Sequence, residues 1–286
     1  MTTICWIGGR WHGADEPLIA PTDRGFLYGD GVFETLRSRN GRFFRLERHL
    51  ARLQRGMDVL SIHPGEGVTE ALEALPGVFE RFGAGDVVIR LSVTRGNGWL
   101  QARPSAQGLV SILAKPAPSS PPDAGRAVLS SVVCDATSPV ADIKTCNWLP
   151  NILARQEAEG LGFDEAILCN GLGYLTEASS SNLFWTIDGE LYTPAIESGA
   201  LPGITREAVI EVAKSIHINV YEGGYLPEAL SESEAAFVTN SVFGIKQLIS
   251  FGEAPLLKED PSRVVVRVRE QLACLIDSEI EVTGVG

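Results

Sequence analysis

Several residue types that mark particular protein classes are scarce in this 286-residue sequence. The five cysteines are odd in number and include no Cys-x-x-Cys pair. This argues against a disulfide framework or a thiolate zinc site and favours the reducing cytoplasm. The four histidines are scattered without a His-Glu-x-x-His spacing, so no metal site is expected.

Positive charge is also limited, with 24 Lys and Arg against 36 Asp and Glu, for a net charge of −12. Nucleic acid is therefore not expected as a partner, because binding to its backbone needs a basic surface. A small anion in a local basic pocket stays compatible with this charge. No apolar run approaches the roughly 18 residues of a membrane span, and residues 1–17 lack the pattern of a secretory signal. The hydrophobic content of 44% is that of a globular protein with one large domain or two ordinary ones.

The first third of the sequence mixes strand and helix patterns. Asn40-Gly41 separates two apolar runs and predicts a hairpin with a type I′ turn. The other elements expected here are a hairpin over 3–11 that turns at Gly8-Gly9, helices over 47–60 and 68–82, and a strand over 86–94.

Residues 115–123 read KPAPSSPPD, a composition that favours extended backbone and cannot join a central ladder. An ordinary surface loop has the same composition, but we interpret it as a linker. The domains are then 1–115, a linker over 116–123, and 124–286. The second domain is expected to hold strands at 127–134, 165–169, 174–187, 190–193 and 235–239, and helices at 149–160, at 205–216 with Thr205 as its cap, and at 264–276.

Lysine is rare, and one of the five lysines stands apart. Lys144 lies between a strand and a helix in VADIKTCNWLPNIL, with apolar neighbours on both sides. Desolvation lowers the pKa of such an amine, and a neutral amine can form a Schiff base. A lysine whose stem lies on apolar surface with its amine in water fits the same local sequence.

Glu177 is a carboxylate inside the apolar run LCNGLGYLTEASSSNLFW. Burying a carboxylate is costly unless it meets a cation or hydrogen-bond donors. One interpretation is a glutamate that faces solvent on a half-exposed strand. The other is a fixed counter-charge for a cationic ligand.

Three further positions have anion-binding character. Ile204 and Thr205 follow Gly203 at an expected helix start, where backbone N–H groups can bind an anion. Ser241 follows an expected strand and adds a hydroxyl, while Arg52 lies within an expected helix. Alone, each also fits a helix cap, a turn or a solvated helix face.

Motifs of other enzyme classes are missing. The sequence has no Gly-x-Ser-x-Gly of an esterase, no phosphate loop of the Gly-x-x-x-x-Gly-Lys-Ser/Thr type, and no complete Gly-x-Gly-x-x-Gly.

Taken in order, the segments resemble the class IV aminotransferases, which are pyridoxal-phosphate enzymes of fold type IV. This group includes branched-chain aminotransferases, D-amino-acid aminotransferases and aminodeoxychorismate lyases. The resemblance spans nearly the whole chain and rests on DRGFLYGDGVFETLR (23–37), HLARL (49–53), NWLPNILARQEA (147–158), DEAILCNGLGYLTEASSSNLFW (164–185) and ALPGITREAVIEVA (200–213).

The resemblance implies a role for each candidate residue. Lys144 matches the lysine that forms the internal aldimine, and Glu177 matches the carboxylate beside the pyridine nitrogen. The remaining matches are phosphate binding by Arg52, Ile204, Thr205 and Ser241, packing near the cofactor by Trp148, and lining of the substrate pocket by Tyr28 and Phe33.

The individual activity within the family is less determined by the sequence. Phe33 and the missing Arg-x-His motif after 94–96 depart from D-amino-acid enzymes. Thr35, and Val242-Phe243 after Ser241, depart from branched-chain enzymes and resemble the lyases. Arg95 and Arg103 are candidate carboxylate clamps, because a guanidinium binds a carboxylate with two hydrogen bonds; solvated loop charges fit equally well.

We expect transamination between an amino acid and a 2-oxo acid, with aminodeoxychorismate lyase as the alternative. A third hypothesis is a catalytically silent relative that binds the cofactor as a structural module. The resemblance further implies an α+β fold with a small N-terminal α/β domain, a larger C-terminal pseudo-barrel domain, and assembly into a homodimer.

Overall fold

The computed structural model describes residues 3–13, 15–16, 18–83, 85–100, 107–118, 124–256 and 263–282, with side chains up to residue 280. The chain divides into two compact units. The first comprises Met1–Pro118, Ile143–Asn147 and Glu279–Gly286, and the second comprises Ser119–Asp142 and Trp148–Ser278. The short segments 143–147 and 279–286 thus belong with the first unit, although the sequence interpretation places them in the second domain. Residues 119–123 of the expected linker lie outside the described residues, so the linker stays a prediction.

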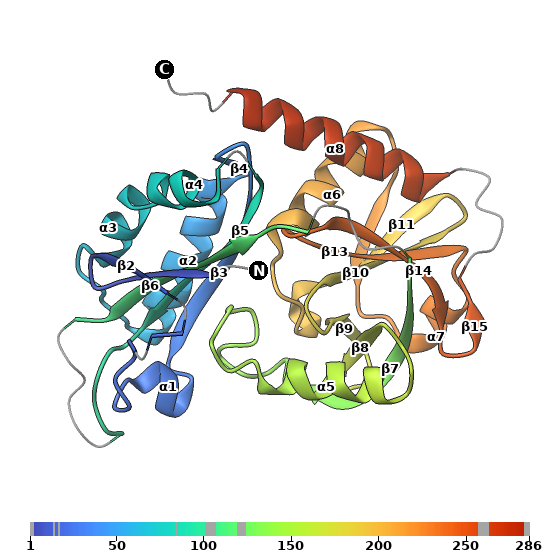
Figure 1. The fold of residues 1–286 in the computed structure, drawn as a ribbon. Helices are drawn as coiled ribbons and strands as arrows, with labels where there is room; N and C mark the ends of the chain where they lie inside the picture. The colour runs from blue at the N-terminus through green and yellow to red at the C-terminus, as the bar shows by residue number, and fades with distance from the viewer. Residues whose placement is uncertain are drawn as a thin grey trace. The chain divides into compact units, whose positions relative to one another are not determined.

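The first unit, which Figure 1 shows, is built on a six-stranded antiparallel sheet. Its strand order is β2-β1-β6-β5-β3-β4. Its strands are β1 Ile4–Ile7, β2 Arg10–Gly13, β3 Gly31–Arg39, β4 Arg42–Phe43, β5 Val87–Thr94 and β6 Leu109–Pro116. The turn between β3 and β4 has φ values of 50° at Asn40 and 78° at Gly41. Positive φ at both central residues defines the type I′ turn, so this hairpin prediction is confirmed.

The helices of the first unit are α1 Arg24–Tyr28, α2 Leu46–Leu60, α3 Gly67–Glu73 and α4 Pro76–Phe82. Helix α2 packs on β3 and α3 packs on β6. The expected single helix over 68–82 is wrong, because the chain forms α3 and α4 instead. Pro76 lacks the N–H that would continue α3, and it occupies the first turn of α4, where a missing N–H costs nothing.

The second unit holds a nine-stranded mixed sheet in the order β12-β11-β10-β13-β14-β7-β8-β9, with β15 paired to β14. The strands are β7 Gly125–Cys134, β8 Glu165–Asn170, β9 Leu175–Ala178, β10 Asn182–Ile187, β11 Glu190–Pro194, β12 Val220–Gly223, β13 Ala235–Asn240, β14 Gly244–Phe251 and β15 Ala254–Pro255. A bridge between Ala178 and Ser181 brings the last strand of this order back to β10, so the sheet curls on itself. The α+β fold class with a C-terminal pseudo-barrel is confirmed.

The helices of the second unit are α5 Leu149–Gly160, the short 3-10 helix η1 Ile196–Ser198, α6 Ile204–Ser215, α7 Pro227–Ser231 and α8 Val264–Val282. Helix α5 lies along β7 and β8, as Figure 1 shows, and α6 packs against β13. The core inside the sheet is apolar and includes Ile167, Leu183, Trp185 and Val238. Within the described part of the chain, no helix combines the length and the apolar character needed to cross a membrane.

Two boundary predictions for the second unit are wrong. The expected strand 174–187 is two strands, because the chain turns at Ser179-Ser180 and Ala178 donates its N–H to the Ser181 carbonyl. Helix α6 begins at Ile204, with Gly203 as its cap residue and no side-chain cap, so Thr205 lies inside the first turn.

Candidate functional site

The residues around Lys144 form a short segment at the edge of β3 in the first unit. Thr145 makes an isolated antiparallel bridge with Val32. The Lys144 carbonyl accepts the N–H of Phe33 at 3.0 Å, and Cys146 donates its N–H to Gly31 at 2.8 Å. The half-buried Lys144 is therefore carried by backbone that the sheet edge holds on both sides of it.

The side chain of Phe33 organises the face of the sheet on which Lys144 lies. Phe33 is 3% exposed, and the Lys144 Nζ lies 4.4 Å from its ring centroid. The guanidinium carbon of Arg90, on β5, lies 3.5 Å from the same centroid. Both cations gain from the negative face of the aromatic ring. Arg90 is a residue that the sequence interpretation did not single out.

Burial shifts the pKa values of two neighbouring side chains, Arg90 and Cys146. It lowers the pKa of Arg90, and the neighbouring Cys146 opposes that shift. Burial raises the pKa of the Cys146 thiol, against the effect of Arg90. The pair therefore places a guanidinium against an uncharged thiol at neutral pH.

Glu34 lies on the opposite face of β3, since successive strand residues point to opposite sides. Its carboxylate is 0% exposed and accepts Arg52 Nε at 2.7 Å, Arg52 Nη2 at 2.8 Å and a bond with His49 Nδ1 at 2.8 Å. Burial alone would raise the pKa of Glu34, but the bonds to Arg52 and His49 outweigh it and lower this pKa to about 2. Burial lowers the pKa of His49 despite the neighbouring carboxylate.

Arg52, predicted to bind phosphate, thus has two of its three nitrogens engaged with Glu34. Sequence reasoning missed Glu34 and His49. Both had a readable signal: Glu34 is a carboxylate within the apolar strand VFETL, and His49 lies three residues before Arg52 on one helix face.

The other substrate candidates of the first unit lie near α1. Tyr28 ends this helix and is 38% exposed, with the Arg24 guanidinium 5.4 Å from its ring centroid. Arg95 donates to both oxygens of Asp30 and to the carbonyls of Leu60 and Ser61 at the end of α2. A carboxylate-clamping role for Arg95 stays a prediction, and it would require some of these bonds to open. Arg103 lies outside the described residues.

Glu177, the acidic residue that the sequence analysis singled out, lies in β9 of the second unit. Its Oε2 accepts the N–H of Leu201 at 3.0 Å and the Asn182 side-chain amide at 3.3 Å. The same amide of Asn182 donates to the Leu201 carbonyl at 2.8 Å. Glu177 is half-buried, and these two donors hold its Oε2 oxygen in place.

The serines after Glu177 form a turn that side-chain hydrogen bonds hold in place. Ser179 donates both its N–H and its hydroxyl to the buried carboxylate of Glu165, and its carbonyl accepts Asn151 at 3.0 Å. Asn240 donates to the Ser180 carbonyl and to the Ser181 hydroxyl. The small polar residues therefore fix the backbone between Glu177 and β10.

A set of donors gathers at the start of α6. Gly203 caps the helix in extended conformation and, as a glycine, supplies no side-chain cap. The hydroxyls of Thr205 and Ser241 lie 3.5 Å apart. The positive end of a helix and two hydroxyls form a set of groups suited to a phosphate. The structure brings the hydroxyls of Thr205 and Ser241 together, and phosphate binding by Ile204, Thr205 and Ser241 stays a prediction.

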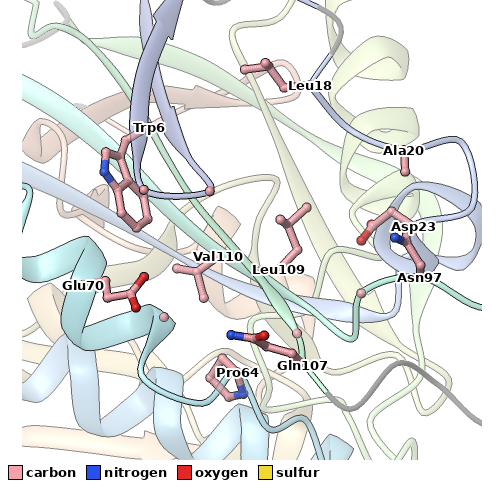
Figure 2. Close-up of a pocket in the computed structure, with 15 residues that line it drawn as sticks. Trp6, Leu18, Ala20, Asp23, Pro64, Glu70, Asn97, Gln107, Leu109 and Val110 are labelled. Carbon is pink, nitrogen blue, oxygen red and sulfur yellow. The ribbon is translucent and has the colours of Figure 1, made fainter.

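Trp148 occupies the cap position of α5 and is half-buried, with its carbonyl accepting the N–H of Ile152. A separate cavity of about 360 Å³ lies in the first unit, next to β1, β6 and the start of α3. Figure 2 shows Trp6, Glu70, Val110 and Gln107 among the residues that line it. The sequence-predicted residues are not part of this lining.

The described residues thus supply a lysine amine in the first unit, and a donor-held carboxylate with a phosphate-type donor set in the second. A lysine, a carboxylate and a helix N-terminus fit pyridoxal phosphate, which carries an aldehyde, a basic ring nitrogen and a phosphate.

Several known proteins are similar to this chain in sequence over most of its length. The family model for amino-transferase class IV matches residues 31–250. The chain is 29% identical over 272 residues to a putative branched-chain-amino-acid aminotransferase of Methanocaldococcus jannaschii, covering 93% of this chain and 94% of that protein. It is 30% identical over 247 residues to the aminodeoxychorismate lyase of Bacillus subtilis (85% and 84% covered), and 33% identical over 242 residues to the D-alanine aminotransferase of Listeria monocytogenes serotype 1/2a (81% of each).

A solved structure shares the fold over almost the whole chain. The branched-chain aminotransferase of the thermophilic archaeon Thermoproteus uzoniensis, crystallised with norvaline, superposes with a TM-score of 0.87 at 26% identity. The match covers 98% of this chain and 97% of that one.

Fold, site chemistry and relatives agree, and the chain belongs to the class IV aminotransferases, a family of pyridoxal-phosphate enzymes. The predictions of this family, of an enzyme and of amino-group transfer are confirmed. The lyase is represented among the relatives.

Proposed function

We propose that this aminotransferase binds pyridoxal phosphate through Lys144, Glu177 and the start of α6, and moves an amino group between an amino acid and a 2-oxo acid. The observation that carries this proposal is the donor set of the second unit. Glu177 is oriented by the Leu201 N–H and Asn182, while the hydroxyls of Thr205 and Ser241 lie close together at the start of α6. A carboxylate and an anion site on one rigid unit suit a ligand with a cationic ring and a phosphate.

Each residue has a physical role in this proposal. The bound cofactor supplies an electron sink for the electrons left at the substrate Cα. Lys144 would hold the cofactor covalently at rest. Once the substrate amine had displaced it, the freed Lys144 amine would take the proton from the substrate Cα and later give it up again within the site. Glu177 keeps a proton on the ring nitrogen. The N–H groups of Ile204 and Thr205, with the hydroxyl of Ser241, bind the phosphate.

Arg52 and Trp148 complete the proposed cofactor site. Arg52 adds positive charge toward the phosphate while Glu34 fixes its guanidinium with two bonds. Trp148 packs its indole near the cofactor from the cap of α5. An indole cannot accept a hydrogen bond as a phenol oxygen does.

The substrate pocket is proposed to include Tyr28 and Phe33, with Arg95 and Arg103 as carboxylate clamps. We add Arg90 to these proposed residues. Its guanidinium lies against the ring of Phe33, as does the Lys144 amine. Arg90 is therefore placed to bind a substrate carboxylate close to the proton-transferring amine.

Borohydride reduction of the purified protein followed by peptide mapping tests the covalent assignment. The expected result is a phosphopyridoxyl label on Lys144 and its loss in Lys144→Ala. A label on another lysine, or on none, contradicts the proposal. Lack of an absorption band that shifts on adding amine would instead indicate the silent relative.

Substrate class is tested by one assay with two arms. The protein receives L- or D-amino acids with 2-oxoglutarate in one arm, and aminodeoxychorismate in the other. The expected result is 2-oxo-acid formation from an amino donor. Pyruvate release from aminodeoxychorismate, with no transamination of either donor series, would assign the protein to the lyase alternative, whose relative matches at 30% identity.

A homodimer in the cytoplasm is also proposed. The odd cysteine number and the family resemblance underlie this part. Sedimentation of the purified protein checks the assembly, and a mass equal to one 30.7 kDa chain would contradict it.

A further inference from the structure

The side chain of Asn182 connects the two parts of the proposed cofactor site in the second unit. Asn182 opens β10 and is 5% exposed. Its Nδ2 donates to Oε2 of Glu177 at 3.3 Å and to the Leu201 carbonyl at 2.8 Å. Since both partners are acceptors, the amide nitrogen must face them, and the amide oxygen must face the other way.

The amide oxygen of Asn182 meets the cap residue of α6. A Cβ added to Gly203 would lie 1.9 Å from Oδ1 of Asn182. Gly203 has φ −72° and ψ 134°, a conformation that any residue adopts, so contact with Asn182 rather than backbone strain explains the glycine. The backbone of α6 therefore packs directly on the amide that holds Glu177.

The backbone of Leu201 bonds both Glu177 and Asn182. Its N–H donates to Glu177 Oε2 at 3.0 Å while its carbonyl accepts Asn182, two residues before the helix cap. One amide therefore fixes the orientation of the carboxylate and its distance from the helix N-terminus. A rigid ligand with a cationic ring nitrogen at one end and a phosphate at the other needs that distance to be constant.

We propose that Asn182 is a positioning residue, which orients the Glu177 carboxylate toward the cofactor ring nitrogen and sets its spacing from the phosphate site of α6. This inference rests on the proposed function and extends it to a residue that does not itself bind the cofactor. Two donors on Oε2 stabilise the charged form of Glu177, and a charged Glu177 keeps the ring nitrogen protonated.

The test compares Asn182→Leu with Asn170→Leu. A leucine at 182 is close to asparagine in size, adds no charge, and leaves the Glu177 carboxylate and the Leu201 carbonyl without the amide donor. Asn170 is the matched control, since it is 6% exposed, lies in the same unit, and donates its amide to the Ser198 carbonyl at 3.0 Å. Both substitutions remove one buried amide donor, so a loss of folding stability is expected in both.

Two readouts separate positioning from folding. The first is the dissociation constant of pyridoxal phosphate, titrated into the apoprotein. The second is the protonation of the ring nitrogen, followed by the 15N signal of labelled cofactor across a pH series. We expect Asn182→Leu to raise the dissociation constant at least tenfold and to lower the pH at which the ring nitrogen loses its proton. Asn170→Leu should stay within twofold of wild type, with an unchanged pH profile.

If Asn182→Leu does not fold, Gly203→Ala provides the same test. Its methyl group must displace the Asn182 amide, and at least a threefold weaker cofactor affinity with the same direction of pH shift is expected. Equal affinities and equal ring protonation in the folded 182 or 203 variant and in the control would overturn the inference. A wild-type protein that takes up no cofactor would instead overturn the proposed function.

Discussion

Arg52 and Glu34 form an ion pair with two parallel hydrogen bonds, of 2.7 and 2.8 Å, between helix α2 and strand β3. The Arg52 side chain is 9% exposed and that of Glu34 is 1% exposed. His49 shares the same carboxylate at 2.8 Å. This pair fixes α2 on the face of β3 opposite Phe33, and so it fixes the strand against which the Lys144 segment lies.

Replacing Glu34 with Gln should destabilise the first unit by about 3–5 kcal/mol, because Arg52 would keep its buried charge without a counter-charge. Chemical denaturation followed by circular dichroism measures this change. The control is Glu159→Gln, which breaks an i,i+4 pair with Arg155 whose glutamate is 57% exposed. That surface pair should contribute below about 1 kcal/mol. An equal loss of unfolding free energy in both variants would show that the Glu34 pair contributes no more to stability than an exposed ion pair does.

Stability should fall as the pH falls below about 6.5. His49 has its pKa lowered from 6.5, so unfolding takes up a proton below that pH and becomes more favourable. Glu34, with its pKa lowered from 4.5 to about 2, contributes stability that is complete above pH 4.5 and is lost as the pH falls toward 2. Denaturation of His49→Gln across pH 7 to 4.5 should show a flatter dependence than wild type. The exposed His63→Gln serves as control, and a flattening there of equal size would remove His49 as the cause.

Replacing Arg90 with Met should weaken substrate binding with little effect on cofactor uptake. A charge-assisted hydrogen bond to a carboxylate is worth about 1.5–3 kcal/mol, so KM for the amino acid should rise about tenfold or more. Steady-state kinetics and a cofactor titration measure the two effects. The exposed Arg10→Met is the control for loss of charge. An unchanged KM in the Arg90 variant would place that guanidinium outside the substrate pocket.

Replacing Gly29 with Ala should disturb the segment that carries Lys144. Gly29 has φ +67°, and a Cβ there would lie 2.3 Å from Oδ1 of Asn147, whose amide donates to the Gly29 carbonyl. Positive φ costs a non-glycine residue about 1–2 kcal/mol before this clash is counted. The midpoint temperature of thermal unfolding and the half-reaction rate with an amino donor should both decrease. Gly160→Ala, where nothing lies within 4 Å of the added Cβ, should leave both unchanged.

Local chemistry made much of the fold predictable. Asn40-Gly41 specified its turn because both residues tolerate positive φ, and the apolar periodicity of 47–60 specified α2. The break in 174–187 was not predictable in this way. The turn at Ser179 depends on the carboxylate of Glu165, fourteen residues earlier, and on Asn151 in α5. No local sequence pattern indicates contacts between residues so far apart in the chain.

The site was predictable only in part, for the same reason. The helix-start signal of Gly203 and the misplaced carboxylate at 177 were visible as local anomalies. Arg90 was not, because it stands on a strand with ordinary alternation, and its role follows from the antiparallel pairing of β5 with β3 that places it beside Phe33. Cross-strand neighbours are set by register, and register is not written in either strand alone.

The attachment of residues 143–147 to the edge of β3 limits how this chain can be divided. A fragment that stops at residue 118 would contain every strand of the first sheet, yet the N–H of Phe33 and the carbonyl of Gly31 would lose the partners that Lys144 and Cys146 provide. Such a fragment would present an open strand edge, a known starting point for aggregation. The N-terminal unit is thus completed by chain made later in synthesis, and Lys144 lies in the segment that completes it.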